Sequence, residues 1–523
     1  MIKKLLPILA AVLLLAACNP KYINTSNDFY VERDTEVDPI PATGGAVKLH
    51  IYWSDARYLM SCKDDFVTLP DFKYFGKLGT SGEIITEVFF AENRSENKRE
   101  ATLVFTPDED TGGLSITMKI IQAGYEPIHA SVSINPSKTF QKWDGFGAMN
   151  LGANWGKAID WSESETDTFM KDMGLNLMRI RIPYDENAWS GLVAGCKYAV
   201  DKYGAHILAS PWTMPARMKT PEQLEASKNG ITSSLKPECY AEYAAYLQRF
   251  VDYMKNAGAP IYAISIQNEP DWTATYEGCI WSAEQHLDFV KNYGDKIDGA
   301  LLMTGESMGS KHSFYDPVLN DATACENIDI VGGHLYGVSP EPYSLAGQKG
   351  KSLWMTEHLL NESWTANTSH WYETLDMLKE IHNCLVNGWN AYIWWYGIRY
   401  YSLLGDGEKN TSRGAILPRG NAFAQYSSAI RPGDVRIGCT SEDADGLLAC
   451  AFKGENGRIS VILLNSGNSR FSDLKLDFGQ KFPEIKASCC SENGKQNVNV
   501  SIDGNIATLD LPGASVTSLV ANP

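Results

Sequence analysis

The stretch Ile264-Ser265-Ile266-Gln267-Asn268-Glu269-Pro270 contains a short apolar run that ends in polar and turn residues. This pattern predicts a buried strand with Glu269 at its end. A second stretch of the same kind, Leu353-Trp354-Met355-Thr356-Glu357-His358, brings Glu357 to the end of another strand. We therefore expect each carboxylate to stand where a buried strand reaches the mouth of a sheet or barrel.

Around these stretches, from Asp144 onward, apolar strands alternate with longer helical segments. Segment 237–258 shows the helical pattern, with a proline at its start, apolar side chains on one face and Gly258 as the stop. Eight strand–helix units predict a (β/α)8 TIM barrel over residues 144–430. A doubly wound open sheet is the competing fold, but its usual phosphate-cradling glycine-rich turn is absent after the first strand. The strand candidates are 145–150, 175–182, 206–212, 262–268, 300–304, 328–336, 353–356 and 391–396.

Two segments of alternating apolar and polar residues flank the barrel. Residues 19–127 have Gly, Asp and Asn clusters between the runs and predict an N-terminal all-β sandwich module. Residues 431–523 predict a C-terminal β-sandwich, and we expect the strand-like segment 128–143 to pair into it. A chain of 523 residues is too long for one core, which agrees with this multidomain organisation.

Residues 1–18 have the order of an export signal, with two lysines, an apolar stretch, small residues and Cys18. The apolar stretch is shorter than the ~20 residues of a comfortable membrane span. A cysteine after small residues resembles a bacterial lipoprotein cleavage box, so we expect Cys18 to be lipidated. The protein would then be exported and held at the outer membrane, on its surface or periplasmic face, through this lipid alone. An ordinary signal peptide that ends beside a cysteine is the alternative.

Charge and motifs argue against several other classes of protein. The formal net charge of −17 gives no basic footprint for nucleic acid. Neither a Cys-x-x-Cys pair nor a His-Glu-x-x-His motif occurs, so no metal site and no cofactor are implied. The cysteines after Cys18 are scattered, and the sequence does not define their pairing. We expect a monomer.

The two glutamates predict a reaction. The strand ends of a TIM barrel face one mouth, so Glu269 after the fourth strand and Glu357 after the seventh should share a cleft. Two carboxylates that face one cleft are the minimum for cleaving a glycosidic bond. Retaining glycosidases hold the two carboxyl groups about 5–5.5 Å apart, one as nucleophile and one as an acid that later serves as base.

Several motifs occur in the order found in a known family. They are Gly145-Phe146-Gly147-Ala148-Met149-Asn150, Ala209-Ser210-Pro211-Trp212, Ile266-Gln267-Asn268-Glu269-Pro270, Gly333-His334-Leu335-Tyr336-Gly337, Leu353-Trp354-Met355-Thr356-Glu357 and Arg431-Pro432-Gly433. With these motifs the chain resembles glycoside hydrolase family 30, and within it the glucuronoxylan-cleaving subfamily. The N-terminal module resembles the carbohydrate-associated module called BACON, in its Gly44-Gly45 turn and its closing Ile121-Gln122-Ala123-Gly124.

The resemblance to family 30 implies a retaining endo-β-1,4-xylanase that acts on glucuronoxylan. It implies that Glu269 is the acid/base and Glu357 the nucleophile. Asn268 would hydrogen-bond the sugar 2-hydroxyl, an interaction that can strengthen in the transition state. Tyr336 would donate a hydrogen bond near the nucleophile.

Further side chains near the predicted mouth are candidates for binding roles. Arg179, at the end of the second strand, is placed to keep the nucleophile ionised. Arg181 lies two residues on, on the same strand face, and is an alternative for that role. Trp155 and Trp212 offer flat apolar faces on which xylose rings can stack, with core packing as the alternative for each.

The segment after the eighth strand carries the signal for a branched substrate. Family members that need a glucuronic acid branch have Trp-Tyr followed by an arginine and a tyrosine, and Trp395, Arg399 and Tyr401 match this spacing. A guanidinium suits a uronate because it can make two parallel hydrogen bonds to one carboxylate. The family often has a second arginine where this chain has Ile398. A local ion pair with Asp406 is the alternative role for Arg399.

Other interpretations stay open. Gly305-Glu306-Ser307-Met308-Gly309 fits the Gly-x-Ser-x-Gly pattern of an esterase nucleophile, and Glu306 competes as glycosidase nucleophile because it too ends a strand. Within the family, the substrate could instead be a β-1,6-glucan, a glucosylceramide-like glucoside or an unbranched xylan. A hypothesis from another class is a surface glycan-binding lipoprotein with a degenerate barrel.

Overall fold

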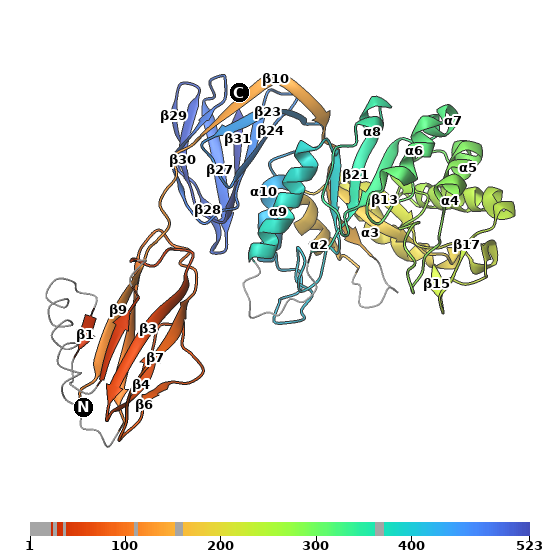
Figure 1. Cartoon of the computed structure of the whole chain (residues 1–523). Coiled ribbons are helices and arrows are strands. Elements are labelled where there is room, and N and C mark those ends of the chain that lie inside the picture. Colours follow the sequence, from red (N-terminus) through yellow and green to blue (C-terminus); the bar gives the residue numbers. More distant parts are fainter. Residues whose placement is uncertain (1–21, 25–28, 35–37, 109–112, 152–159, 361–370) are drawn as a thin grey trace. The chain divides into compact units, whose positions relative to one another are not determined.

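The computed structural model describes residues 22–24, 29–34, 38–108, 113–151, 160–360 and 371–523 (Figure 1). The chain forms two compact units. One comprises Met1–Ile128 with Asn468–Phe471, and the other His129–Gly467 with Ser472–Pro523. Two residues of interest from the sequence, Cys18 and Trp155, lie outside the described residues.

The first unit is all-β, as predicted. A five-stranded sheet in the order β1-β2-β3-β7-β5 and a four-stranded sheet in the order β6-β4-β8-β9 contribute to one apolar core. The period of two explains this arrangement, because alternate residues of β3 such as Leu49 and Ile51 are buried and their neighbours are not. The strands are β1 Tyr22–Asn24, β2 Phe29–Arg33, β3 Gly45–Ser54, β4 Arg57–Cys62, β5 Val67–Thr68, β6 Tyr74–Gly76, β7 Ser81–Phe90, β8 Arg99–Pro107 and β9 Ile116–Gln122.

The second unit contains a closed parallel barrel with the strand order β11-β12-β13-β18-β19-β20-β21-β22. Each predicted strand segment overlaps one barrel strand, so the TIM-barrel prediction is confirmed. An apolar layer fills the barrel interior, and it includes Leu177, Leu208, Met303 and Trp354. The strands are β11 Gly145–Asn150, β12 Leu177–Ile182, β13 His206–Pro211, β18 Ala263–Ser265, β19 Leu301–Met303, β20 Ile330–His334, β21 Ser352–Glu357 and β22 Ala391–Trp394.

Helices lie between the barrel strands in sequence and cover them. In the segment predicted as a helix from 237 to 258, Pro237–Cys239 forms a 3₁₀ turn and α4 follows, with Gly258 in the left-handed region at φ 79° after it. The α-helices are α2 Glu163–Asp167, α3 Ser190–Tyr203, α4 Tyr240–Asn256, α5 Ala283–Tyr293, α6 His312–Asn320, α7 Ala322–Glu326, α8 Ser344–Gln348, α9 Trp371–Val386 and α10 Pro418–Ser427.

The C-terminal β-sandwich takes a strand from the sequence before the barrel. Strand β10 pairs antiparallel with β23 and parallel with β26, within a ten-stranded sheet arrangement. Trp371 at the start of α9 donates to the backbone oxygen of Ala514, which ties this domain to a barrel helix. The strands are β10 Ser131–Lys142, β23 Val435–Glu442, β24 Leu447–Lys453, β25 Ile459–Asn465, β26 Phe471–Asp477, β27 Glu484–Ser491, β28 Gly494–Asn497, β29 Ser501–Asp503, β30 Ile506–Leu511 and β31 Ser515–Asn522.

Two further observations concern the described residues as a whole. None of their helices is both long and apolar enough to cross a membrane. Their cysteines are all free thiols, most of them buried.

Candidate active site

The carboxylates of Glu269 and Glu357 meet at the mouth of the barrel. Glu269 follows β18 and Glu357 is the last residue of β21. One oxygen of each and a ring nitrogen of His334, the last residue of β20, all lie within 4.8 Å of one another. Both glutamates are nearly buried, with exposed fractions of 7% and 5%. This separation is close to the spacing of retaining glycosidases and shorter than the ~6.5–9.5 Å of inverting ones.

Glu357 is held by an arginine and a tyrosine. Arg179 donates from Nη1 to Oε2 at 2.5 Å, and the hydroxyl of Tyr336 donates to Oε1 at 3.0 Å. The period of two along β12 explains the placement, because Arg179 lies on the same inward face as Leu177 of the barrel interior. Arg181 instead pairs with Glu277 at 2.5 Å. Of the two arginines, Arg179 therefore contacts the predicted nucleophile.

Glu269 is held in a special backbone conformation. Its φ of 45° lies in the left-handed region, which is unfavourable for a residue with a Cβ. Its amide donates to the backbone oxygen of Glu306 at 3.0 Å, which fixes this conformation. The hydroxyl of Tyr276 donates to Oε2 at 3.1 Å, and Nδ1 of His334 lies 3.1 Å from Oε1. Neither contact was predicted from the sequence.

Glu306 is the third carboxylate of the site. It is completely buried, and its Oε1 lies 3.1 Å from Nη2 of Arg179 and 3.7 Å from Nε2 of His334. Burial raises the pKa of Glu306, but the charges of Arg179 and His334 outweigh burial and hold it well below its usual range. A carboxylate so enclosed and paired has no access to a sugar. Glu306 is thus a counter-charge rather than a nucleophile.

His334 is a cation in this setting. Burial alone would lower its pKa, but the charge of Glu357, the hydrogen bond to Glu269 and the nearby carboxylate of Glu306 raise the pKa of His334 to about 9. The same network acts on Glu357. Burial raises the pKa of Glu357 and the charge of Glu269 raises it further, and the opposing charges of His334 and Arg179 leave it above its usual value.

A charge count shows what this network can hold. The carboxylates of Glu269, Glu306 and Glu357 face two cations, Arg179 and the His334 imidazolium. A buried net charge is costly, so the site favours one additional proton on its carboxylates. A metal ion would find three donor atoms at suitable spacing here, but the two cations disfavour it.

Asn268 is oriented by the same arginine. Its Oδ1 accepts a hydrogen bond from Nη2 of Arg179 at 2.7 Å, and the side chain is almost fully buried. Because the amide oxygen is occupied, the NH₂ group faces the other way and is left to donate. The arrangement supplies a donor beside the paired carboxylates.

Trp212 is more deeply packed than the predicted stacking role requires. Its exposed fraction is 2%, its ring lies 5.9 Å from that of Trp395, and the guanidinium of Arg179 lies 4.9 Å from its ring centre. The described side chains therefore cover most of its surface. Trp155, the other predicted stacking residue, lies outside the described residues.

The segment after β22 places Arg399 among tyrosines. Its guanidinium carbon lies 5.5 to 6.0 Å from the ring centres of Tyr396, Tyr400 and Tyr401. Its Nη1 also lies 3.6 Å from Oδ2 of Asp406, which is the ion-pair partner expected if Arg399 does not bind substrate. Arg399 is not a surface arginine, because its side chain is only 14% exposed.

Lys219 connects two loops beside the mouth. This fully buried lysine donates from Nζ to Thr213 Oγ1 at 3.0 Å and to the backbone oxygens of Leu224, Glu225 and Gly278 at 3.1, 3.2 and 2.6 Å. Gly278 stands two residues after Tyr276, the donor to Glu269. The ammonium group thus supports the loop that presents Tyr276.

The esterase-like motif has a structural role in this fold. The hydroxyl of Ser307 donates to Asp271 at 2.9 Å and accepts from the amide of Lys311 at 3.1 Å. The side chain is completely buried. A serine nucleophile needs an exposed hydroxyl beside a base, so this arrangement disfavours the esterase hypothesis.

Two family models match the chain. The model of the glycosyl hydrolase family 30 TIM-barrel domain matches residues 160–352, and that of the glycosyl hydrolase family 30 beta sandwich domain matches residues 433–483. The glucuronoxylanase XynC of Bacillus subtilis strain 168 is 36% identical over 404 residues, which is 75% of this chain and 92% of that protein. The endo-1,6-beta-D-glucanase neg1 of Aspergillus fumigatus is 24% identical over 53% of this chain and 62% of that protein.

Solved structures agree with these matches. The glycoside hydrolase family 30 subfamily 8 xylanase Xyn30A from Clostridium acetobutylicum aligns with a TM-score of 0.66 at 32% identity, over 75% of this chain and all of that one. A family 30 endoxylanase from Clostridium papyrosolvens aligns with a TM-score of 0.65 at 30% identity, also over 75% and 100% of the two chains.

Proposed function

The chain belongs to glycoside hydrolase family 30, and on this premise we propose that it is a retaining endo-β-1,4-xylanase that cuts glucuronoxylan at a position set by a (methyl)glucuronic acid branch. The meeting of Glu269 and Glu357 within 4.8 Å carries this proposal. It supports a double displacement, in which one carboxylate attacks the sugar while the other handles the proton.

The contacts of each glutamate support a division of roles. Arg179 and Tyr336 both donate to Glu357 and so stabilise its negative charge, which suits a nucleophile. Glu269, which Tyr276 and His334 contact, is then the group that protonates the leaving oxygen. In the first step Glu357 bonds to the anomeric carbon while Glu269 protonates the departing oxygen. In the second step Glu269 takes a proton from water, and the water oxygen replaces Glu357 on the anomeric carbon.

Asn268 and Arg399 support the choice of substrate. The NH₂ group of Asn268 is left to donate to a sugar hydroxyl next to the cleavage point. Arg399 is a nearly buried guanidinium ringed by tyrosines after the eighth barrel strand, and it is the candidate anchor for a uronate. The similarity to XynC, which is named a glucuronoxylanase, favours the branched xylan over the neutral polymers.

Product analysis tests this proposal. Purified protein is incubated with glucuronoxylan and with linear xylan, and the products are sized while the anomeric configuration of early products is followed by NMR. We expect acidic xylo-oligosaccharides of defined length from the branched polymer, little product from the linear one, and β-configured first products. First products of α configuration would contradict retention, and equal cleavage of both polymers would contradict branch recognition.

A β-1,6-glucanase is the second candidate, because neg1 and further relatives named as endo-1,6-beta-glucanases also match the chain. The same assay with a β-1,6-glucan decides between the two. A glycan-binding role without catalysis predicts an unchanged polymer together with measurable binding in every arm.

We also propose a setting for the enzyme. Export and lipidation at Cys18 would hold a monomeric enzyme at the outer membrane, and a BACON-like N-terminal module would separate the barrel from the anchor. The order of residues 1–18 and the all-β first unit support these proposals. Incorporation of labelled palmitate in wild type but not in Cys18→Ala tests the anchor.

A further inference from the structure

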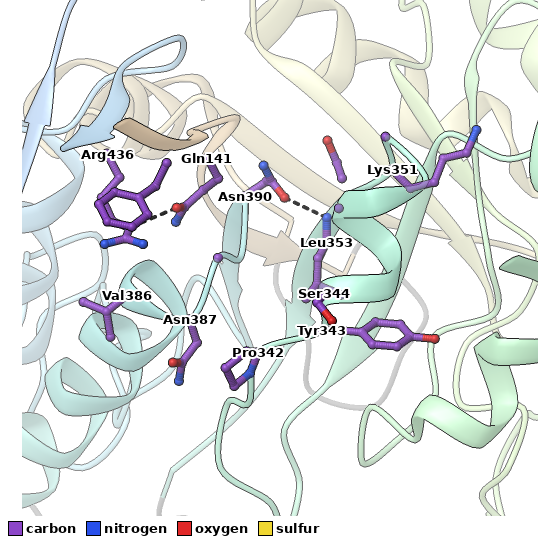
Figure 2. A pocket seen from close by; sticks show the side chains of 15 residues that line it. Gln141, Pro342, Tyr343, Ser344, Lys351, Leu353, Val386, Asn387, Asn390 and Arg436 are labelled. Atoms are coloured by element: carbon purple, nitrogen blue, oxygen red, sulfur yellow. Dashed lines mark hydrogen bonds between the residues drawn. The ribbon is translucent and has the colours of Figure 1, made fainter. Parts of the chain in front are cut away.

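A cavity of about 560 Å³ (Figure 2) lies at the opposite end of the barrel from the two glutamates. Ser352 and Leu353 at the start of β21 line it, whereas Glu357 ends that strand. At ~3.3 Å per residue the two ends of β21 are ~16 Å apart. The volume of the cavity falls in the range of small-molecule binding sites. It is therefore a second place where a ligand of sugar size fits.

The charge of the lining is one-sided. Arg436 and Lys351 line the cavity, and the lining contains no aspartate or glutamate. The ammonium of Lys351 donates to the backbone oxygen of Ile328 at 2.6 Å, so Arg436 supplies the charge that faces the cavity. The chain as a whole carries a formal net charge of −17, so acidic residues are common elsewhere. A concave surface that contains a cation and no carboxylate attracts an anion.

Arg436 is held rigidly at the wall of the cavity. Its guanidinium carbon lies 3.6 Å from the ring centre of Phe140, and its Nε donates to Oε1 of Gln141 at 2.9 Å. The amide nitrogen of Gln141 donates to the backbone oxygens of Leu385 and Trp389, so its amide oxygen must face the arginine. Figure 2 shows Gln141 bonded to Arg436. The guanidinium is thus positioned before any ligand arrives.

The two terminal nitrogens of Arg436 have no protein partner among the described residues. The side chain is half-buried, and burial lowers the pKa of Arg436 because no carboxylate compensates. A partly desolvated cation without a counter-charge costs stability, which a bound anion restores. The fork of two N–H groups matches the two oxygens of a carboxylate.

Neutral polar groups surround the same space. Ser344 lies on α8 and Asn387 lies in the turn between α9 and β22, and Figure 2 shows both beside the cavity. The amide nitrogen of Asn387 is used by the backbone oxygen of Pro340, which leaves its Oδ1 to accept a hydrogen bond. The Ser344 hydroxyl can donate or accept. Such groups suit the hydroxyls of a sugar better than a bare inorganic anion.

We propose that this cavity binds a uronic acid residue, with its carboxylate on Arg436 and its hydroxyls on Ser344 and Asn387. The site is separate from Arg399 at the barrel mouth and goes beyond the proposed function. Two sources share this chemistry, namely a glucuronic acid branch on an intact polymer and an acidic fragment released by hydrolysis. The origin of the uronic acid in glucuronoxylan rests on the proposed function, whereas its binding is argued from the cavity itself.

Calorimetric titration tests the site directly. The full chain carries Glu357→Gln and Arg399→Ala, so neither hydrolysis nor the mouth arginine contributes, and glucuronic acid is the titrant. We expect saturable binding that Arg436→Gln weakens at least tenfold, while the matched control Arg217→Gln removes the same charge from an exposed arginine without effect. Unchanged binding in Arg436→Gln would overturn the proposal, whatever the outcome of the hydrolysis assays.

A second variant guards against misfolding of the first. Gly347 lines the cavity, and a Cβ placed on it meets no atom within 4 Å, so Gly347→Tyr adds a bulky side chain to the lining while Arg436 itself stays unaltered. We expect it to abolish the same binding while the circular dichroism melting curve stays unchanged. Xylose should not bind. Phosphate or acetate binding as tight as that of glucuronic acid would overturn the uronic acid assignment in favour of a general anion site.

Titration with a larger ligand separates the two sources. An acidic xylo-oligosaccharide that binds through Arg436 as tightly as intact glucuronoxylan supports capture of a released fragment. Binding of the polymer alone supports a branch on the intact chain. If neither ligand depends on Arg436, the proposal fails.

Discussion

Arg179 donates a hydrogen bond from Nη1 to Oε2 of Glu357 at 2.5 Å, and both side chains are buried at the barrel mouth. The same guanidinium contacts Asn268 at 2.7 Å and Glu306 at 3.1 Å. One planar cation therefore orients the predicted nucleophile, the predicted sugar-binding amide and the buried counter-charge at once. The ammonium group of a lysine is a compact point charge and cannot make these contacts in one plane.

Arg179→Lys should lower kcat on glucuronoxylan by about 10²-fold, because an ammonium cannot serve three partners in one plane. Arg181→Lys is the matched control, since it changes a buried arginine two residues away on the same strand that pairs with Glu277 instead. We expect Arg181→Lys to change kcat less than threefold. Initial rates for both variants at saturating substrate provide the measurement, and equal losses would argue against a specific role for Arg179.

Glu269→Ala should affect substrates according to their leaving groups. Loss of a general acid costs about 10²–10⁴-fold on the polymer, whose departing sugar needs a proton. An aryl xylobioside that carries the glucuronic acid branch and an acidic phenol needs no such proton for the first step, so its bond cleavage should be nearly as fast as in the wild type. Burst kinetics on this substrate, followed by rescue with azide, measure the effect. Glu357→Ala should abolish the burst with both leaving groups, and a surviving burst would exchange the two roles.

Sequence reasoning succeeded where a periodic pattern carries the information. Buried parallel strands are continuous apolar runs, so all eight barrel strands could be located, and strand ends of such a barrel share one mouth. The convergence of Glu269 and Glu357 follows from these two facts. The choice between Arg179 and Arg181 does not follow from the sequence, because residues two apart lie on the same face of a strand. Only the structure shows that the two side chains have different partners.

The residues that sequence reasoning missed either lie in irregular segments or act through several partners that are distant in sequence. Tyr276 and Lys219 lie in loops, where no period indicates which side chain turns inward. A lysine that binds four oxygens in place of solvent has no local sequence signature. His334 was quoted only as part of a motif, because its charge depends on three glutamates that are distant in sequence.

The charge of His334 should make stability depend on pH. The folded pKa of about 9 exceeds the ordinary histidine value of 6.5, so the stabilisation is fully present below pH 6.5 and is lost as the pH rises through 9. The difference between the two pKa values corresponds to a contribution on the order of 3 kcal/mol to the free energy of unfolding. Urea unfolding of the barrel, followed by tryptophan fluorescence between pH 6 and 10, should show this decline. His334→Gln should flatten it, and an unchanged pH profile would contradict an imidazolium at this position.

Lys219→Met should destabilise the barrel by roughly 3 kcal/mol, because it leaves buried backbone oxygens without donors. It should also weaken catalysis, since the loop with Tyr276 loses its support. Lys236→Met is the control, because that lysine lies on the same side of the barrel and pairs at the surface with Glu222, where a single ion pair contributes little. Urea midpoints and kcat of both variants are compared. A stable and fully active Lys219→Met variant would contradict the loop-bridging role.

The pair Arg399 and Asp406, whose nearest charged atoms lie 3.6 Å apart, sets the expected strength of branch recognition. Arg399→Ala should raise KM for glucuronoxylan about tenfold or more and leave the low activity on linear xylan unchanged, since only the branch carries a carboxylate. Asp406→Asn should act in the opposite direction, because it removes a competing carboxylate of similar shape. We expect it to lower KM for the branched polymer at low salt, with the gain fading as salt screens the interaction. If Arg399→Ala slows both polymers equally, Arg399 serves the fold of this segment through Asp406 and not the substrate.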